Sequence, residues 1–497
     1  MTAGPLLAGI DLGTTTCRCA VVDLDGAVLG SAMRETATRY PRPLWAEVDP
    51  ETWWCETARV VRDAVSASGV EVTDIAAVGV SGLMHAPVLL DAHDRPVLPA
   101  MLWMDQRCSE QVDRVRVAAA RLGRADQVPL GTTFTAPKLA WLAENEPSTL
   151  LSAERLLLPK DYVRYKLTGA DGTDRSDAFG TGLYDARTGD WLWDLVDALD
   201  VPRRLMPRIG RAESLAGSVS PDGASATGLA PGTPVAVGGG DGLCTRLGSG
   251  ALGADEVCLY LGTAAWLAPA EFGKPWGNSQ RLGFGATSAT GAALRWLRDA
   301  FEAPHDYVRL VEVAEDVQPG AEGLFFLPHL MGERAPSSDP LARGALVGLT
   351  LRHSYPQVAR AVLEGTVFQL RRILDRGQPG VATAPGGRGS GVASGGVARS
   401  PVWMQLIADV TGLTLRVPES VESGALGAAM LAATAAGLAS LDAAQARMTR
   451  VGRTYAPDPK RAAEYAALYA RYCELDDLLA PWFHAAAEPA AASSLPG

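Results

Sequence analysis

The tripeptide Leu-Gly-Thr occurs twice in this chain of 497 residues, once in each half. Residues 12–14 and residues 261–263 each follow an apolar run, and each copy predicts a strand, a tight glycine turn and a second strand. Such a turn directs backbone N–H groups and short hydroxyls at one point, which suits a phosphate group. Two of these turns could hold one polyphosphate between them, so a cleft-type phosphotransferase is the leading hypothesis. Two unrelated hairpins are the alternative.

Length and charge narrow the class of protein. A chain of 497 residues is too long for one core and predicts two domains or three. The net charge of −11 argues against nucleic acid as the main partner, so local N–H groups and a metal cation would have to hold any anionic ligand. No apolar run reaches the length of a membrane span, and no basic segment resembling a secretory signal opens the chain. The seven scattered cysteines, without a CxxC pair, predict reduced thiols in a cytoplasmic protein without structural zinc.

The pattern of apolar residues and turns predicts alternating strands and helices in both halves, and so an α/β fold with two domains and a cleft. The boundary is expected near residues 245–255. Predicted strands cover residues 6–10, 17–22, 27–30, 75–80, 88–90, 234–237, 282–289 and 323–328. Predicted helices cover residues 53–66, 105–120, 136–145, 160–168, 292–301, 357–372, 402–410 and 425–436, with a further helix opening at Asp241. Residues 377–391 read as a loop, and the composition from residue 485 onward predicts a disordered tail.

Two aspartates are the main candidates for chemistry. Asp11 ends a strand beside Gly13 and three threonines, and a carboxylate facing phosphate needs a divalent cation between them. Asp241 follows three glycines at the start of a helix, where it could accept a proton from a substrate hydroxyl. The alternatives are a turn residue for Asp11 and a helix N-cap for Asp241.

Two further segments suit a polar ligand. His85, in the Met84-His85 loop between two strands, could hydrogen-bond a ligand or serve only the fold. The segment from Trp103 to Arg107 places a flat ring beside hydrogen-bonding groups, which suits a carbohydrate, although a core Trp before a solvated helix is the alternative. Residues 248–253 match GxGxxG but in the reverse structural context, and the chain contains no GxxxxGK[ST] motif, which excludes a P-loop enzyme.

Together these segments resemble the FGGY family of carbohydrate kinases, in the actin/hexokinase/Hsp70 superfamily, over about residues 7–436. Residues 344–349 with 357–364 are similar to the second signature of the family, and residues 134–142 approximate the first, with Thr133 as a minor departure. Within the family the chain is most similar to xylulokinases, through residues 44–50, 53–54, 84–85, 158–162, 176–181 and 331–336.

The resemblance implies a fold, cofactors and roles for individual residues. The fold would be two ribonuclease H-like (actin-like ATPase) domains, residues 1–247 on the sugar side and 248–484 on the nucleotide side, with the catalytic cleft between them and a tail over 485–497. ATP and Mg²⁺ are the implied cofactors, and a small sugar or polyol, best D-xylulose, is the implied acceptor. No nucleic acid or membrane partner is expected. Homodimers are frequent among such relatives, although the sequence of this chain shows no interface. Asp241 would be the catalytic base, and Asp11 and Asp241 the carboxylates on the metal. The sugar would contact Met84, His85, Trp103, Asp105 and Gly242. The nucleotide would contact Gly13, Thr14, Thr15, Arg18, Gly262, Thr263, Gly395, Gly396 and Val397.

Three departures from the xylulokinase pattern fall at the expected sugar pocket. Gly242 and Met104 stand where Asn is common, and Ala86 stands where Gly is common. A lost amide costs about 1–3 kcal/mol if it leaves a substrate hydroxyl unpaired. Another ketose, gluconate, a polyol or a cyclitol therefore remains an alternative acceptor. An actin- or chaperone-like ATPase and a catalytically silent sugar sensor are rivals from other classes, and the presence of both Asp11 and Asp241 disfavours the sensor.

Overall fold

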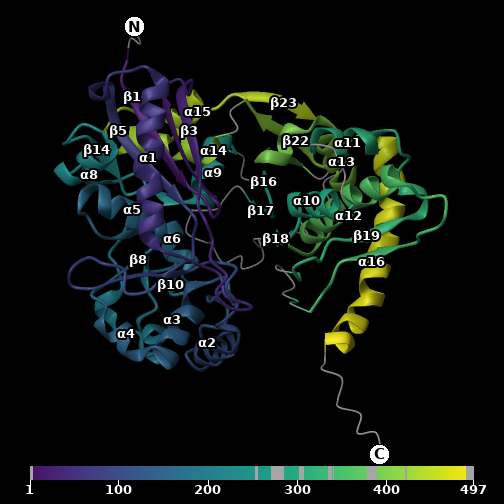
Figure 1. Ribbon diagram of the computed structural model, residues 1–497, viewed down its shortest axis with the longest axis horizontal. Coiled ribbons are helices and arrows are strands. Elements are labelled where there is room, and N and C mark those ends of the chain that lie inside the picture. Colours follow the sequence, from purple (N-terminus) through teal and green to yellow (C-terminus); the bar gives the residue numbers. More distant parts are fainter. Residues whose placement is uncertain are drawn as a thin grey trace, which may run out of the picture. The chain divides into compact units, whose positions relative to one another are not determined.

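The computed structural model (Figure 1) describes residues 4–251, 256–269, 285–301, 307–333, 339, 341–377, 389–419 and 422–487. Its contacts divide the chain into two compact units. The first contains the chain up to Gly250 together with Glu422–Arg450, and the second contains most of the remainder. Parts of four segments named in the sequence analysis lie outside the described residues: 282–284, 334–336, 378–388 and 488–497.

A mixed sheet forms the centre of the first unit. Its strand order is β13 (Leu215–Ser218), β14 (Pro234–Ala236), β5 (Ile75–Gly82), β1 (Leu6–Leu12), β2 (Thr16–Val22) and β3 (Val28–Glu35). Strands β14, β5 and β1 are parallel, whereas β13, β2 and β3 are antiparallel to their neighbours. The short strand β15 (Gly239–Gly240) pairs with the end of β5. The predicted first hairpin is therefore present, with β3 longer than expected.

The sheet of the second unit repeats this arrangement. Its order is β18 (Gly285–Thr287), β17 (Ala265–Pro269), β16 (Val257–Leu261), β21 (Ser390–Ser394), β22 (Thr414–Pro418) and β23 (Val451–Tyr455). As in the first sheet, three antiparallel strands are followed by two parallel ones and an antiparallel edge. The two Leu-Gly-Thr copies occupy the same place, after the central strand of each sheet. The repeat in the sequence thus reflects a repeat of the whole sheet.

Two helices cover opposite faces of the first sheet. Strand residues alternate between faces, and those on one side form a core with α1 (Pro50–Ser68) while those on the other pack on α14 (Ser423–Ala435). On the α14 side, Gly9 and Gly79 are paired across β1 and β5. A Cβ on either would collide with a carbonyl oxygen of α14, so only glycine allows the helix this close.

Helix α14 also packs on α9 (Asp241–Ser249) through glycine contacts, Gly427 against the backbone of Cys244 and Gly248 against that of Ser423. Eleven of its residues, from Ser423 to Ala433, are buried. This packing places residues 422–450 in the first unit, unlike the division at residue 247/248 expected from the sequence. A helix that is apolar on every side predicts burial but does not say against which sheet.

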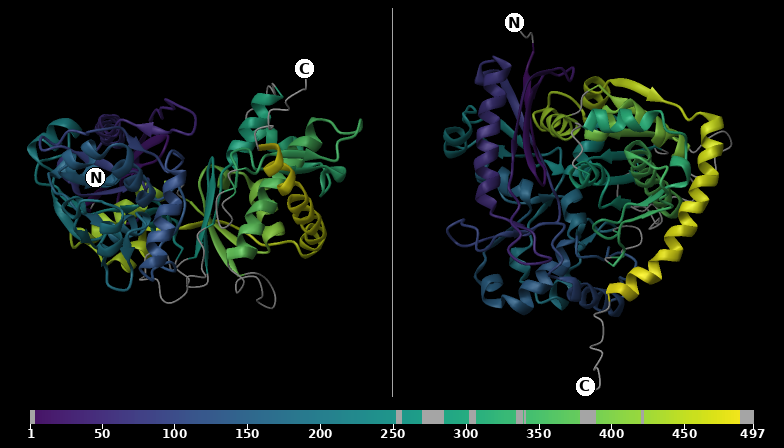
Figure 2. Two further views of the ribbon diagram at one scale, coloured as in Figure 1. Left: turned by 90° about the horizontal axis from the view of Figure 1, so that it is seen from below. Right: turned by 45° about the vertical axis from the view of Figure 1, so that its right-hand side comes forward.

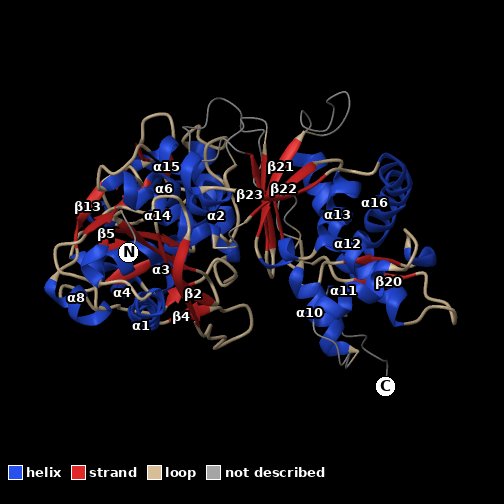
Figure 3. Ribbon diagram, turned by 90° about the horizontal axis from the view of Figure 1, so that it is seen from above, coloured by secondary structure: helices blue, strands red, loops and turns tan. Residues whose placement is uncertain are grey.

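The second unit stacks helices on its sheet. Helices α12 (Tyr355–Gly377) and α13 (Pro401–Thr411) lie beside the sheet, and α16 (Pro459–Ala487) packs outside α13, as Figure 3 shows next to the red strands β21 and β22. Tyr465 and Tyr472 of α16 are fully buried in this core. The sequence reasoning did not assign α16, the long yellow helix of Figure 2, which continues two residues past the expected start of the tail.

Most of the remaining predicted elements are present with shifted ends. The helices α2 (Ser109–Arg121), α3 (Thr135–Asn145), α5 (Pro159–Thr168) and α10 (Gly291–Ala300) and the strands β6 (Val88–Leu90) and β19 (Phe325–Leu327) are examples. Helices α2, α3, α4 (Pro147–Ser152) and α7 (Trp193–Ala198) enclose a separate small core in the first unit. Among the described residues, no helix has both the length and the apolar character needed to cross a membrane.

Gly79→Ala tests the approach of α14 to the first sheet. The added methyl would overlap the carbonyl oxygen of Ala428, and overpacking of this kind costs about 1–3 kcal/mol. We expect scanning calorimetry to show a lower Tm. Gly217→Ala in β13 is the control, because its Cβ would meet its nearest atom at an ordinary 3.6 Å. Equal Tm values for the two variants would contradict the contact.

Candidate active site

The carboxyl ends of three strands meet in the first unit and bring the two predicted aspartates to the same edge of the sheet. Asp11 near the end of β1 is paired with Ser81 of β5, whose hydroxyl donates a 2.7 Å hydrogen bond to Asp11 Oδ1. Ser81 is paired in turn with Gly239 of β15. Asp241 follows that strand directly. The ends of parallel strands are where α/β sheets usually bind ligands.

Asp11 is a carboxylate closely surrounded by neighbouring groups. It lies on the α14 face, where Gly424 in the first turn of that helix approaches it so closely that a Cβ would collide with the carboxylate. Burial raises the pKa of Asp11, while the hydrogen bond from Ser81 and the charge of Arg18 oppose the rise. Arg18 also forms a 3.1 Å ion pair with Glu422. A cation bound beside Asp11 would favour the ionised carboxylate and so oppose the effect of burial.

Asp241 is the first residue of α9, and Gly240 is the N-cap. The structure therefore does not support the alternative in which Asp241 is the N-cap of this helix. The Asp241 side chain is partly exposed, and its Oδ1 accepts a 2.8 Å hydrogen bond from the N–H of its neighbour Gly242.

Met84 and His85 pack against two glycines. A Cβ on Gly180 would lie 2.7 Å from Met84 Cε and 3.1 Å from His85 Nδ1, and one on Gly240 would lie 2.8 Å from Met84 Sδ. Nδ1 of His85 lies 2.7 Å from the carbonyl oxygen of Gly180, which can only accept, so Nδ1 carries the proton. Met84 therefore lies against the residue that precedes Asp241, and Nδ1 of His85 is used by the contact with Gly180.

The first Leu-Gly-Thr turn differs in one respect from the prediction. The Gly13 N–H donates to the carbonyl of Thr16 at 2.8 Å, so it is used by the turn and is not directed at a ligand. Thr14 accepts a 2.9 Å hydrogen bond from the Trp103 indole N–H, and the Thr15 carbonyl accepts from Thr36. Trp103 thus contacts the turn directly. The hydroxyl of Thr15, on an exposed residue, remains suited to an anion.

Asp105 and Ala86 are corrections to the predicted sugar pocket. Asp105 is fully buried, and its oxygens accept from the Ala46 N–H and from the backbone and guanidinium of Arg107. Arg107 is stacked 3.4 Å from the centre of the Trp45 ring. The Asp105 oxygens are therefore used by the fold around Arg107, and the Ala86 side chain is fully buried in the core of the α1 side, so the structure does not present these two side chains to a ligand.

The predicted nucleotide residues of the second unit also converge. The Gly262 N–H donates to Ala264 within the turn, and the Gly262 and Thr263 carbonyls accept from the first N–H groups of α10. Gly395, at a φ of 95°, follows β21 so close to Leu261 that a Cβ would lie 2.6 Å from its carbonyl oxygen. Gly396 faces open space. The Val397 side chain, in contrast, belongs to the core, so this residue could offer a ligand only its backbone.

Two family models match the chain: the N-terminal domain of the FGGY family of carbohydrate kinases over residues 6–248 and the C-terminal domain over residues 264–436. This chain belongs to the FGGY family of carbohydrate kinases. The xylulose kinase of Escherichia coli (strain K12) is 34% identical over 86% of this chain and 90% of its own. The solved xylulose kinase of Lactobacillus acidophilus superposes with a TM-score of 0.86 at 26% identity, over 97% of this chain and 99% of its own. A gluconate kinase from Lactobacillus acidophilus reaches 0.85 at 26% identity with the same coverage.

The membership establishes the class of reaction. The FGGY kinase described here is an ATP-dependent phosphotransferase with the actin-like ATPase fold, and it uses Mg²⁺ with ATP to phosphorylate a small sugar-like substrate. The resemblance, the fold class, the enzyme class and the cofactors predicted from the sequence are thereby confirmed.

The carboxylates fit a magnesium ion that the nucleotide helps to hold. Among the described residues, no group of three or more His, Cys, Asp or Glu side chains could form a complete metal cage. Mg²⁺ bound with nucleotides commonly takes one or two carboxylates and completes its shell with phosphate and water oxygens. Asp11, with its raised pKa and its contact with Gly424, suits that role.

A buried charge network supports the Asp241 segment in this FGGY kinase. The Lys160 ammonium lies 2.5 Å from Asp161, 3.0 Å from Asp174 and 3.1 Å from Asp177, all inaccessible to solvent. Burial alone would lower the pKa of Lys160, but the three carboxylates raise it. Asp174 accepts from the Ser176 hydroxyl, which accepts a 2.9 Å hydrogen bond from the Gly240 N–H. The network therefore ends one residue before Asp241.

Sequence reasoning missed two residues of this site. Ser81 contacts Asp11, and Ser176 contacts Gly240, yet a lone serine carries no signal by itself. Segment 176–181 did stand out through its resemblance to xylulokinases, which was the available clue to Ser176.

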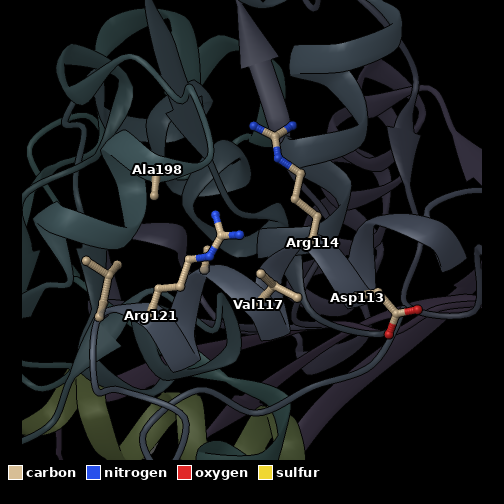
Figure 4. Close-up of a pocket in the computed structure, with 7 residues that line it drawn as sticks. Asp113, Arg114, Val117, Arg121 and Ala198 are labelled. Atoms are coloured by element: carbon tan, nitrogen blue, oxygen red, sulfur yellow. The ribbon is translucent and has the colours of Figure 1, made fainter.

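A surface hollow of about 500 Å³ lies between α2 and α7, apart from every predicted site residue. Figure 4 shows Arg114, Val117 and Arg121 along one side of α2 there. Arg114 forms ion pairs with Glu144 and Asp200, so its positive charge in this hollow is balanced by carboxylates.

Lys160→Met tests the buried network. It would leave the buried Asp174 and Asp177 without the cation that pairs with them, whereas Asp161 would keep its ion pair with Arg164. Breaking a buried pair costs about 3–5 kcal/mol. Lys166→Met on the same helix is the control, because its ion pair with Glu51 is partly exposed and should be worth below about 1 kcal/mol. We expect urea unfolding to show a much lower midpoint for Lys160→Met. Similar midpoints would refute the assigned role.

Proposed function

We propose that this FGGY kinase phosphorylates D-xylulose to D-xylulose 5-phosphate. The observation that carries the proposal is the contact of Met84 with Gly240, because it brings the predicted sugar loop against the segment that presents Asp241. The names of the relatives add support, since this chain matches proteins named xylulose kinase at 27–34% identity over most of their length.

In the proposed reaction the terminal hydroxyl oxygen of the ketose bonds to the γ-phosphorus of ATP, and the bond to the bridging oxygen of ADP breaks. Asp241 takes the hydroxyl proton, which its partly exposed carboxylate can do beside Gly242. Mg²⁺, held on the side of Asp11, would neutralise charge on the phosphates. His85 and Met84 orient the ketose, and Thr15, Arg18, Thr263 and Gly396 supply contacts to the nucleotide.

Gluconate is the second candidate acceptor. It is favoured by Gly242, which offers the sugar no side-chain amide beside Asp241, and by the similarity to a protein named gluconate kinase. Ala86 does not bear on this choice, because it is buried in the core. Met104 is partly exposed and replaces a polar residue of the xylulokinase pattern, so it bears on the choice as Gly242 does.

We further propose a cytoplasmic enzyme, for which the support is that all seven cysteines are free thiols. A homodimer is proposed on the family resemblance alone, and sedimentation velocity would decide it.

A panel of acceptors tests the substrate. With ATP and Mg²⁺, we expect the rate of coupled ADP release to be higher with D-xylulose than with any other acceptor of the panel. The other acceptors are L-xylulose, D-ribulose, gluconate, glycerol, erythritol, arabitol and cyclitols. Turnover on gluconate with none on D-xylulose would reject the first candidate in favour of the second.

Asp241→Asn tests the proton acceptor. The amide keeps the shape but cannot take a proton, so kcat should fall by about 10²–10⁴ while calorimetry still detects acceptor binding. Asp222→Asn is the matched control, since Asp222 is an exposed carboxylate in the first turn of another helix, α8 (Pro221–Thr227). A kcat for Asp241→Asn within threefold of the unmodified enzyme would exclude Asp241 as the base.

A further inference from the structure

A buried lysine and a threonine hold the backbone of the predicted sugar loop. Lys138 of α3 is fully buried, and its ammonium donates to the carbonyl oxygens of His85 at 3.2 Å and Thr133 at 2.8 Å. The Thr135 hydroxyl donates to the same His85 oxygen at 3.0 Å. One carbonyl thus accepts two hydrogen bonds from one turn of α3.

The residue held in this way has an unusual backbone. His85 has a φ of 76°, the left-handed region that non-glycine residues rarely adopt. Such a conformation costs of order 1–3 kcal/mol and persists only where its surroundings enforce it. The two donors to the His85 carbonyl act on the backbone itself and help to enforce it.

We infer that Lys138 is a positioning residue for acceptor binding, whose ammonium, together with the Thr135 hydroxyl, keeps His85 in the left-handed conformation and thereby sets the places of the Met84 and His85 side chains. The inference rests on the proposed sugar contacts of Met84 and His85. The departure at Thr133 leaves this contact unchanged, because Lys138 uses only the carbonyl of that residue.

The side chains of the loop depend closely on this backbone. The His85 ring makes its 2.7 Å hydrogen bond to Gly180 and an edge contact with Phe134 at 5.3 Å. Phe134 directly precedes Thr135 and Lys138. A change of the His85 φ would move the ring off both Gly180 and Phe134, and would move Met84 off Gly240.

The hydrogen bonds from Lys138 to the carbonyl oxygens of His85 and Thr133 should also weaken at alkaline pH. Burial lowers the pKa of Lys138 to about 8, with Cys108 and Asp105 opposing the change and Arg107 adding to it. Below this pH the charged ammonium makes charge-assisted hydrogen bonds, and above it the neutral amine makes weaker ones. Acceptor binding should therefore weaken as the pH rises through about 8.

Lys138→Met is the first test, with Lys166→Met as the control on a partly exposed lysine. We expect the KM for the acceptor to rise about tenfold or more, a loss typical of a charge-assisted hydrogen bond, with the KM for ATP within about twofold. In the unmodified enzyme the acceptor KM should rise above pH 8, and in Lys138→Met this rise should be absent. Thr135→Val, which keeps the shape and loses one donor, should give a smaller rise and remains informative if Lys138→Met does not fold.

A second readout needs no acceptor. The chain has six histidines, so ¹⁵N-histidine labelling gives few ring signals, and the His85 Nδ1–H signal is identified by its loss in His85→Gln. We expect this signal to shift or broaden in Lys138→Met and in Thr135→Val. An unchanged His85 signal and an unchanged acceptor KM in the folded variants would overturn the inference. Failure of D-xylulose in the panel would instead reject the proposed substrate, and the kinetic test would then use the acceptor that the panel finds.

Discussion

The close approach of α14 to the first sheet is the contact on which the site of that unit depends. Gly9 and Gly79 have no side chains, so the helix backbone rests directly on β1 and β5. The same helix packs on α9 through Gly427. It therefore fixes, from one rigid element, both the strand that carries Asp11 and the helix that begins with Asp241. A cavity or a bulge here would disturb both carboxylates together.

Glycine serves the site in a second way, by leaving room for side chains of other elements. Gly180 and Gly240 accommodate Met84 and His85, and Gly424 accommodates the Asp11 carboxylate. Each of these contacts joins segments far apart in the sequence. The two buried lysines fill space instead of leaving it. Lys160 supplies positive charge to buried carboxylates, and Lys138 supplies hydrogen-bond donors to buried carbonyl oxygens. Only five lysines occur in the chain, and two of them are fully buried at these points.

The sequence predicted those features that local pattern determines. The Leu-Gly-Thr repeat indicated two equivalent hairpins, and the apolar runs located most strands and helices. The predictions that the structure does not support concern the groups that a residue or helix contacts in the folded chain. Asp105 has the right residue type for sugar binding, but whether its carboxylate is available depends on Arg107 and the Ala46 N–H, which only the fold brings there. The Gly13 N–H appeared free because its acceptor lies across the turn. The return of residues 422–450 to the first unit was unpredictable for the same reason, since a uniformly apolar helix carries no signal of its destination.

The two sheets share a topology but differ in the residue that precedes Leu-Gly-Thr, and this difference assigns them different chemistry. In the first sheet the residue is Asp11, paired across the strands with Arg18. In the second it is Tyr260, paired with Trp266 and stacked on its ring at 5.8 Å. A carboxylate oxygen is a ligand that Mg²⁺ prefers, whereas two stacked aromatic rings are not. The difference therefore supports the proposal that proton acceptance and metal binding belong to the first unit. The second unit presents Thr263 and the Gly395-Gly396 loop, which suit the recognition of phosphate and of a neutral ring.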